Sequence, residues 1–218
     1  MTPIKNQSCP LCSSQHYDHF HQDQDRDYLS CQQCSLIFVS PAQFLSLEEE
    51  KARYDQHQNS PFDQEYRKFL NHLCIPLAKE LLPQSVGLDF GSGPGPTLSK
   101  MFEEKGHVMD IYDCFYANDR EVFNRQYDFI SMSEVIEQLH NPKKELERLW
   151  GCLKMNGKLG IMTNFVKDRR DFTTWHYKSE ETHVCFFSKK TFEWLASFWN
   201  TQANFAGENV VIFNKDIK

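Results

Sequence analysis

A short loop with three glycines in alternate positions is the feature of this chain that most constrains its fold. The loop follows the apolar stretch 86–90, which contains Asp89, and its glycines are Gly91, Gly93 and Gly95. Glycine adopts positive φ angles freely and has no Cβ, so such a loop turns tightly and brings the backbone close to a bound molecule. The sequence therefore predicts a buried strand that turns around a ligand.

Pro96 directly follows this loop, at the position where a dinucleotide-binding fingerprint would need its third glycine. Proline suits the first turn of a helix, because its missing N–H has no partner to lose there. We therefore expect a helix to begin at this point. An NAD-linked oxidoreductase remains the less favoured enzymatic alternative.

The size and composition of the chain predict one α/β domain with a small additional module. It has 218 residues, of which 40% are hydrophobic and 25% are charged. No apolar run is long enough to span a membrane, and the first residues lack the pattern of a secretory signal, so we expect a cytoplasmic protein. The net charge of −6 opposes binding to a phosphate backbone, and a small-molecule partner is favoured over nucleic acid.

Two Cys-x-x-Cys pairs near the beginning predict a zinc ribbon over residues 1–41. The four candidate ligands are Cys9, Cys12, Cys31 and Cys34. This spacing lets four thiolates meet at one tetrahedral Zn²⁺, and a site filled by four thiolates is structural because no position stays open for water. We expect the ribbon to need the metal in order to fold, since so short a segment cannot build a core alone.

Two features of the ribbon stay open at this point. Three histidines between the pairs could replace a cysteine as ligands or could be exposed on a polar hairpin: His16, His19 and His21. The ribbon itself could be a structural cap or could dock RNA or protein. The other four cysteines are expected to be free thiols: Cys74, Cys114, Cys152 and Cys185.

The rest of the chain predicts a connector over 42–60 with some helical tendency and an α/β domain over 61–218. The expected helices cover 61–82, 96–105, 142–153 and 189–198, and the expected strands cover 86–90, 108–112, 127–132, 159–163, 203–205 and 210–214. We expect loops at 155–158 and an irregular stretch at 165–182. Alternating strands and helices predict a doubly wound, mostly parallel sheet, and the short turn between the last two strands predicts an antiparallel hairpin at its edge.

The order of these motifs resembles that of class I S-adenosylmethionine-dependent methyltransferases over roughly residues 60–215. The resemblance rests on Asp-x-Gly-x-Gly-x-Gly after the first strand of the domain, on Asp113 after the second and on SEVIEQLHNP after the next. The opening CPLC and CQQCSLIFVSP, followed by DQHQN, YDCFY and WHYKSEETHVCFF, resembles the bacterial subgroup that joins an amino-terminal zinc ribbon with four cysteine ligands to such a domain.

This resemblance implies a set of cofactor-binding residues. Gly91, Gly93 and Gly95 would approach the methionine and ribose of the cofactor, with Asp89 near the amino group. Asp113 would accept hydrogen bonds from the ribose hydroxyls, or it is a solvated loop acid. Glu134 would lie at the methionine end, or it is a helix-start acid that interacts with the macrodipole. An acidic cleft suits a sulfonium cation, and a carboxylate suits a vicinal diol.

The chain departs from the family pattern in two places. Between Asp113 and Tyr127 there is too little chain for a helix, a strand and a second helix. Strand three of the family fold is therefore expected to be missing or reduced, and no acid matches the one that contacts adenine from that strand. Gln138 stands where family members often have histidine.

Candidate catalytic residues lie in the segment that follows the predicted strand 159–163. Methyl transfer is an in-line displacement, so the protein supplies alignment and, for a weak nucleophile, a base. His183 is a candidate base or acceptor-orienting residue, or a structural histidine that ties the loop to the sheet. His176 is the second candidate, and His57 in the connector could close over the site or could be exposed.

The sequence thus predicts a methyltransferase that uses S-adenosylmethionine, holds a structural Zn²⁺ and acts on a small metabolite. The resemblance suggests a sugar or a nucleotide-linked intermediate as the acceptor class. The alternative is a ribbon that docks RNA or protein beside a domain that methylates macromolecules or only binds the cofactor. The sequence determines neither the acceptor atom nor the oligomeric state.

Overall fold

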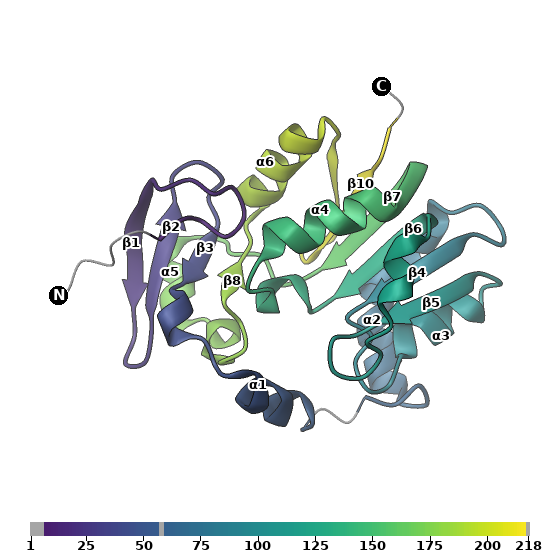
Figure 1. Cartoon of the computed structure of the whole chain (residues 1–218), viewed down its shortest axis with the longest axis horizontal. Helices are drawn as coiled ribbons and strands as arrows, with labels where there is room; N and C mark the ends of the chain where they lie inside the picture. Colours follow the sequence, from purple (N-terminus) through teal and green to yellow (C-terminus); the bar gives the residue numbers. More distant parts are fainter. Residues whose placement is uncertain (1–6, 57–58, 217–218) are drawn as a thin grey trace.

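The computed structural model describes residues 7–56 and 59–216, so the candidate His57 lies outside the described residues. Figure 1 shows the arrangement of the elements. The strands are β1 (Tyr17–Gln22), β2 (Asp27–Cys31), β3 (Ile37–Val39), β4 (Val86–Phe90), β5 (Val108–Tyr112), β6 (Tyr127–Ser133), β7 (Leu153–Met162), β8 (Cys185–Phe186), β9 (Ala203–Ala206) and β10 (Val210–Asn214). The α-helices are α1 (Leu47–Tyr54), α2 (Gln64–Lys79), α3 (Thr97–Glu103), α4 (Pro142–Cys152), α5 (Arg169–Thr174) and α6 (Lys189–Trp199). Short 3₁₀ helices are η1 (Pro41–Gln43), η2 (Arg120–Asn124), η3 (Ile136–Gln138) and η4 (His176–Ser179).

A mostly parallel sheet forms the centre of the larger part of the molecule. Its strand order is β5-β4-β6-β7-β10-β9. The first four strands are parallel, and β10 is antiparallel to both β7 and β9. This confirms the predicted sheet and its antiparallel hairpin, and it places the carboxyl ends of β4, β5 and β6 along one edge.

Helices cover both faces of this sheet, as a doubly wound fold requires (Figure 1). Neighbouring residues of β6 alternate between the two faces. Phe129 belongs to the apolar cluster formed with α2 and α3, whereas Ile130 belongs to the cluster that includes α4 and α6. Because both faces are covered, the central strands β4 and β6 are mostly buried and consist largely of apolar residues, which is why they were visible in the sequence.

The expected helix boundaries shift where side chains cap the helices. Asp63 accepts hydrogen bonds from the backbone N–H groups of Glu65 and Tyr66, at 2.9 and 3.2 Å, and α2 therefore begins at Gln64 rather than at 61. Pro96 lies at the N-cap of α3, one position earlier than the first-turn placement that its chemistry suggested.

Two stretches predicted to lack regular structure are partly regular. The expected loop 155–158 is wrong, because β7 runs from Leu153 through this stretch as an irregular strand whose pairing with β6 shifts register. The expected irregular stretch 165–182 contains α5 and η4. Asp168 starts α5 by accepting a hydrogen bond from the backbone N–H of Asp171 at 2.8 Å, a cap that the sequence analysis did not use.

The reduction expected at strand three is confirmed. Between β5 and β6 the described chain has only an isolated bridge of Asp113 with Ala117 and the 3₁₀ helix η2. β5 is therefore an edge strand of the sheet.

The amino-terminal part, which we call the cysteine module (residues 7–41), is joined to the domain through its sheet. β1, β2 and β3 are antiparallel, and β3 pairs in turn with β8, which lies in the chain between β7 and β9 of the large sheet. Buried side chains of the module, including Tyr28 and Phe38, share one apolar core with the domain. The module is thus packed into the molecule.

The chain after the cysteine module forms a helix, as the helical tendency of 42–60 suggested. Ser46 and Glu49 make a capping box at the start of α1. Among the residues that the structure describes, no helix has both the length and the apolar character needed to cross a membrane.

Gly87 and Gly151 offer a matched test of the sheet packing. A Cβ on Gly87 would lie 2.3 Å from the ring of Phe129, whereas a Cβ on Gly151 in α4 would meet nothing within 4 Å. We expect Gly87→Ala to lower the free energy of unfolding by about 1–3 kcal/mol through overpacking. Gly151→Ala should leave it unchanged or raise it by up to about 1 kcal/mol. Urea denaturation measures both, and equal stability of the two variants would contradict the packing described here.

Candidate functional site

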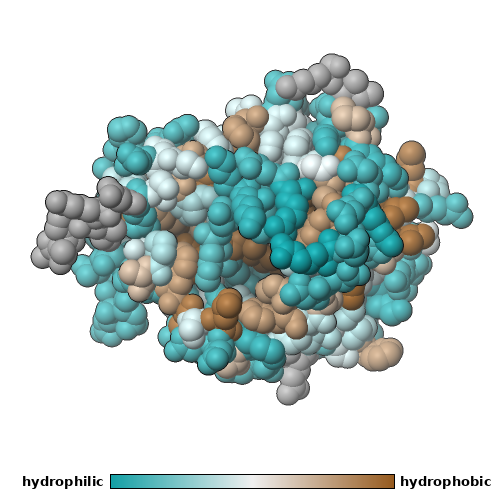
Figure 2. Space-filling view, in the orientation of Figure 1, coloured by the Kyte–Doolittle hydropathy of each residue, from teal (hydrophilic) through white to brown (hydrophobic). Residues whose placement is uncertain are grey.

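A cavity of about 930 Å³ opens at the carboxyl ends of β4, β5 and β6. Its walls come from the glycine loop, the chain after β5, the chain after β6, helices α1, α2 and α4, and the segment 176–183. Figure 2 shows this face, on which apolar side chains gather near α1 within a mainly hydrophilic surface. Doubly wound sheets bind their ligands at this edge, so the cavity is the candidate site.

The three predicted glycines have two different roles in the structure. Gly91 and Gly93 line the cavity with φ angles of 79° and 63°, a conformation that favours glycine. A Cβ on Gly95 would instead lie 2.0 Å from the backbone oxygen of Asn59. Gly95 is therefore required by packing against the connector, and it is not among the residues that line the cavity.

Asp113 fixes the glycine loop and the chain that follows β5. Its carboxylate accepts hydrogen bonds from the backbone N–H groups of Gly93 at 3.0 Å, Phe115 at 2.9 Å and Tyr116 at 3.1 Å. The residue is only 9% exposed and lines the cavity. The alternative of a solvated loop acid does not fit this environment.

Asp89 lies under the glycine loop and does not line the cavity. It is buried in β4, and Ser131 of the neighbouring strand β6 donates a hydrogen bond to its Oδ1 at 2.9 Å. Burial raises the pKa of this carboxyl to about 6. The structure thus places Asp89 where it links two strands, and its proximity to the amino group of the cofactor stays a prediction.

Glu134 reaches into the cavity from the turn after β6. Its backbone has a φ of 53°, and the hydroxyl of Tyr177 donates a hydrogen bond to its Oε2 at 2.9 Å. Burial raises the pKa of Glu134 to about 7. The acid in the first turn of η3 is Glu137, so the helix-start role considered for Glu134 belongs to its neighbour.

Glu137 and Thr163 extend this contact into a chain of hydrogen bonds that the sequence analysis missed. The hydroxyls of Tyr177 and Thr163 lie 3.1 Å apart, and Thr163 Oγ1 lies 2.7 Å from Glu137 Oε2. Each hydroxyl has one hydrogen, so the chain is complete when protonated Glu137 donates to Thr163 and Thr163 donates to Tyr177. Glu137 is 0% exposed, and burial together with the nearby charge of Glu134 raises its pKa to about 8. A second glutamate three residues after Glu134 was the available signal for this pair.

The two candidate histidines lie in different environments. His183 is 7% exposed, with its Nδ1 2.8 Å from the backbone oxygen of Tyr177 and its Nε2 3.9 Å from Glu137 Oε1. His176 also lines the cavity but is exposed at its rim. Of the two, only His183 lies beside the buried acids, and Gln138 lines the cavity nearby.

Helix α1 of the connector forms one wall of the cavity, whereas the sequence analysis had considered only His57 of this connector. Glu50 and Tyr54 line the cavity, and Glu50 Oε1 lies 2.7 Å from Nε2 of His140. At the end of the helix, Tyr116 donates a hydrogen bond to Asp55 at 2.6 Å. The connector is therefore part of the site.

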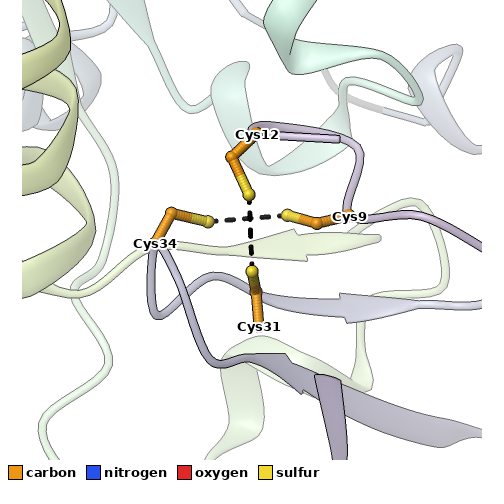
Figure 3. A group of neighbouring side chains, drawn as sticks. All are labelled: Cys9, Cys12, Cys31 and Cys34. Atoms are coloured by element: carbon orange, nitrogen blue, oxygen red, sulfur yellow. Dashed lines mark hydrogen bonds between the residues drawn. The ribbon is translucent and has the colours of Figure 1, made fainter. Parts of the chain in front are cut away.

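The four predicted cysteines converge on one point, as Figure 3 shows. Their sulfur atoms all lie within 4.8 Å of one another, with Cys9 and Cys34 3.5 Å apart and Cys12 and Cys31 3.4 Å apart. A tetrahedral zinc with Zn–S bonds of about 2.3 Å needs sulfur atoms about 3.8 Å apart, so the cluster suits this ion. The candidate metal group in the described residues contains these cysteines alone, without the three histidines of the module.

Comparisons with known proteins find a matching methyltransferase family and methyltransferases of similar fold. A family model described as "Methyltransferase domain" matches residues 62–206. No curated protein matches the sequence.

Three solved structures share the fold. Burkholderia thailandensis 1,6-didemethyltoxoflavin-N1-methyltransferase, solved with 1,6-didemethyltoxoflavin and S-adenosylhomocysteine, has a TM-score of 0.54 and 15% identity over 92% of this chain and 100% of its own. A chain from the complex of the Haloferax volcanii Trm112 methyltransferase activator with a methyltransferase has a TM-score of 0.52 and 9% identity, over 78% and 97%. The calicheamicin-biosynthesis methyltransferase CalO1 with bound S-adenosylhomocysteine has a TM-score of 0.51 and 12% identity, over 78% and 58%. At these identities the likeness concerns the fold.

The buried acid Glu137 should make stability depend on pH. Its folded pKa, about 8, lies above the ordinary value of 4.5, so the folded state binds more protons than the unfolded state between these values. The stabilisation is complete below pH 4.5 and is lost as the pH rises through 8. We expect the unfolding free energy of Glu137→Gln to fall less than that of the wild type between pH 5 and 8.

Thermal unfolding followed across this pH range measures the effect. Glu147→Gln, at an exposed position of α4, is the matched control and should follow the wild type. Parallel curves for Glu137→Gln and the wild type would show that Glu137 is charged throughout this range.

Proposed function

The chain belongs to the methyltransferase domain family, and on that premise we propose that it transfers a methyl group from S-adenosylmethionine to a small molecule. The observation that carries the proposal is the carboxylate of Asp113, which lines the cavity while it holds the N–H of Gly93. This arrangement combines a rigid glycine loop with a fixed hydrogen-bond acceptor at the carboxyl ends of two parallel strands.

On this proposal Gly91 and Gly93 approach the cofactor, and Oδ2 of Asp113 accepts a hydrogen bond from a ribose hydroxyl. Oδ1 already accepts from the N–H groups of Phe115 and Tyr116, whereas Oδ2 accepts from Gly93 alone and keeps one lone pair for the cofactor. S-adenosylmethionine supplies an electrophilic methyl group on a sulfonium when bound. The acidic side chains of the cavity, Glu134 among them, favour a cationic ligand.

We assign proton transfer to Glu134, together with the hydroxyl of Tyr177 that binds it. Glu134 lines the cavity with a pKa raised to about 7, which suits a base that accepts a proton from an acceptor O–H or N–H near neutral pH. Tyr177 holds Glu134 through its hydroxyl, and the chain through Thr163 fixes Tyr177 in turn.

The two histidines receive supporting roles on this proposal. The backbone oxygen of Tyr177 can only accept, so the Nδ1 of His183 carries the hydrogen and its Nε2 faces Glu137. His183 is thus the candidate that positions Tyr177, with its Nε2 on the side of Glu137. His176, at the rim of the cavity, is the candidate that orients the acceptor.

We also propose that the four cysteines hold a structural Zn²⁺. The metal would fill its four positions with thiolates, so it would stabilise the cysteine module and leave no position for water or substrate. The close approach of the four sulfur atoms supports this assignment.

A small acceptor is favoured over a macromolecule. The cavity, about 930 Å³, is at the upper end of the range of small-ligand sites, which leaves space for a nucleoside and a small acceptor together. The net charge of −6 opposes nucleic acid. Strand β3 of the cysteine module is paired with β8 of this same chain, which supports a structural role for the module over docking of RNA or protein.

Binding of S-adenosylhomocysteine tests the cofactor site. We expect titration calorimetry with the purified, metal-loaded protein to detect binding, and Asp113→Asn to weaken it about tenfold or more, because a charge-assisted hydrogen bond is lost. Asp171→Asn, an exposed position of α5, should bind like the wild type. If the wild type binds neither S-adenosylhomocysteine nor S-adenosylmethionine, the proposed function is wrong.

Transfer to a small molecule is tested with a metabolite extract and methyl-labelled S-adenosylmethionine. Mass detection should find a labelled methyl on a small compound. With that compound, Glu134→Gln should lower turnover by about 10²–10⁴, as expected for loss of the proton-transfer group. Tyr177→Phe should lower turnover by less, because it removes only the hydrogen bond that holds Glu134, and should leave S-adenosylhomocysteine affinity unchanged. Label found only on RNA or protein would support the macromolecular alternative.

A further inference from the structure

The turn between β1 and β2 of the cysteine module contacts the segment that carries Tyr177 and His183. This turn is held by Asp23, whose Oδ1 accepts hydrogen bonds from the backbone N–H groups of Asp25 at 3.1 Å and Arg26 at 2.9 Å. These hydrogen bonds hold the turn in one conformation. The side chains of Asp23 and Arg26 then connect the turn to the domain.

Arg26 binds the backbone of the segment at several points. Its guanidinium donates to the backbone oxygen of Lys178, to those of Glu180 and Glu181 at 3.3 Å each and to that of His183 at 2.9 Å. Arg26 is 8% exposed. A planar fork with five donors suits several converging carbonyl groups, whereas a lysine could not reach them together.

Asp23 and Lys178 add a second link between the same two parts. Lys178 Nζ lies 2.8 Å from Asp23 Oδ2, and Tyr28 donates to the same oxygen at 2.8 Å. Burial would raise the pKa of Asp23, but the hydrogen bonds from Lys178, Arg26 and Tyr28 outweigh it and hold the pKa well below its usual value. The carboxylate is therefore ionised and the ion pair with Lys178 is permanent near neutral pH.

The opposite side of the segment faces the cavity. Tyr177 donates its hydroxyl to Glu134 there, and His183 contacts the backbone of Tyr177 through Nδ1. Tyr177 belongs to the short 3₁₀ helix η4, and the residues 180–183 that follow form no helix or strand whose backbone hydrogen bonds could fix them. Arg26 supplies hydrogen bonds that a helix or sheet would otherwise provide.

We propose that Arg26 is a positioning residue for methyl transfer, and that the cysteine module fixes the acceptor side of the site through Arg26 and the Asp23–Lys178 pair. The module would thus fix the positions of Tyr177 and His183. The hydrogen bonds of Asp23 and Arg26 to the domain do not reach the glycine loop. The inference rests on the proposed function, which defines this side of the cavity as the acceptor side, but the contacts themselves can be tested without an acceptor.

Hydrogen exchange of Arg26→Gln, with S-adenosylhomocysteine binding measured in parallel, tests the proposal. We expect the hydrogen-bonded backbone amides of Lys178, His183 and Val184 to exchange at least about tenfold faster than in the wild type, because opening of the segment then costs less by roughly one hydrogen bond's free energy. Exchange in β4 and β6, and the affinity for S-adenosylhomocysteine, should be unchanged. Arg170→Gln, an exposed arginine of α5, is the matched control and should leave all of these readouts unchanged.

Lys178→Met provides a second variant that removes the ion pair while it keeps Arg26. It should raise exchange in the same segment by a smaller factor. Unchanged protection of 177–184 in both variants would overturn the proposal, as would an equal loss of protection in β4 and β6, which would make Arg26 a general stability residue. Failure of the proposed function would appear separately, as absent S-adenosylhomocysteine binding in the wild type.

Discussion

The backbone of Val184 connects the three parts on which the site depends. Its carbonyl oxygen accepts a hydrogen bond from the N–H of Val39 in the cysteine module at 2.9 Å, and its N–H donates to the carbonyl oxygen of Glu137 at 2.8 Å. The module, the segment with His183 and the turn with the buried acids are therefore bonded through one residue. An unpaired backbone N–H or C=O group in a buried residue costs free energy, so both hydrogen bonds are kept. The three parts therefore hold fixed positions relative to one another.

The electrostatics of the cavity follow from this arrangement. Glu134 and Glu137 are brought close together in a buried place, and burial raises the pKa of each. A cationic ligand beside Glu134 would favour its ionised form and so bind more tightly than a neutral one. On the proposed function, the site receives a positively charged sulfur on one side and carries out proton transfer on the other.

The sequence predicted the parts whose signal is local. The glycine loop, the strands around it and the four cysteines depend on short patterns, and the structure has them where they were expected. Asp89 and Gly95 match the family motif yet face other protein groups, because a motif fixes the backbone and not what surrounds each side chain. Glu137, Thr163 and the Arg26 contacts join residues far apart in the chain, and no spacing rule reveals such pairs.

β5 is an edge strand of the large sheet, and such strands can associate with other molecules. An edge strand with free backbone groups can pair with a strand of another chain. Arg125 lies 3.0 and 2.8 Å from the carboxylate oxygens of Asp110 on this strand, and the hydroxyl of Tyr127 binds the same carboxylate at 2.8 Å. Because β4 lies between β5 and β6, this cluster lies over a face of the sheet beside the edge strand. Charged side chains on an edge strand disfavour its pairing with another chain.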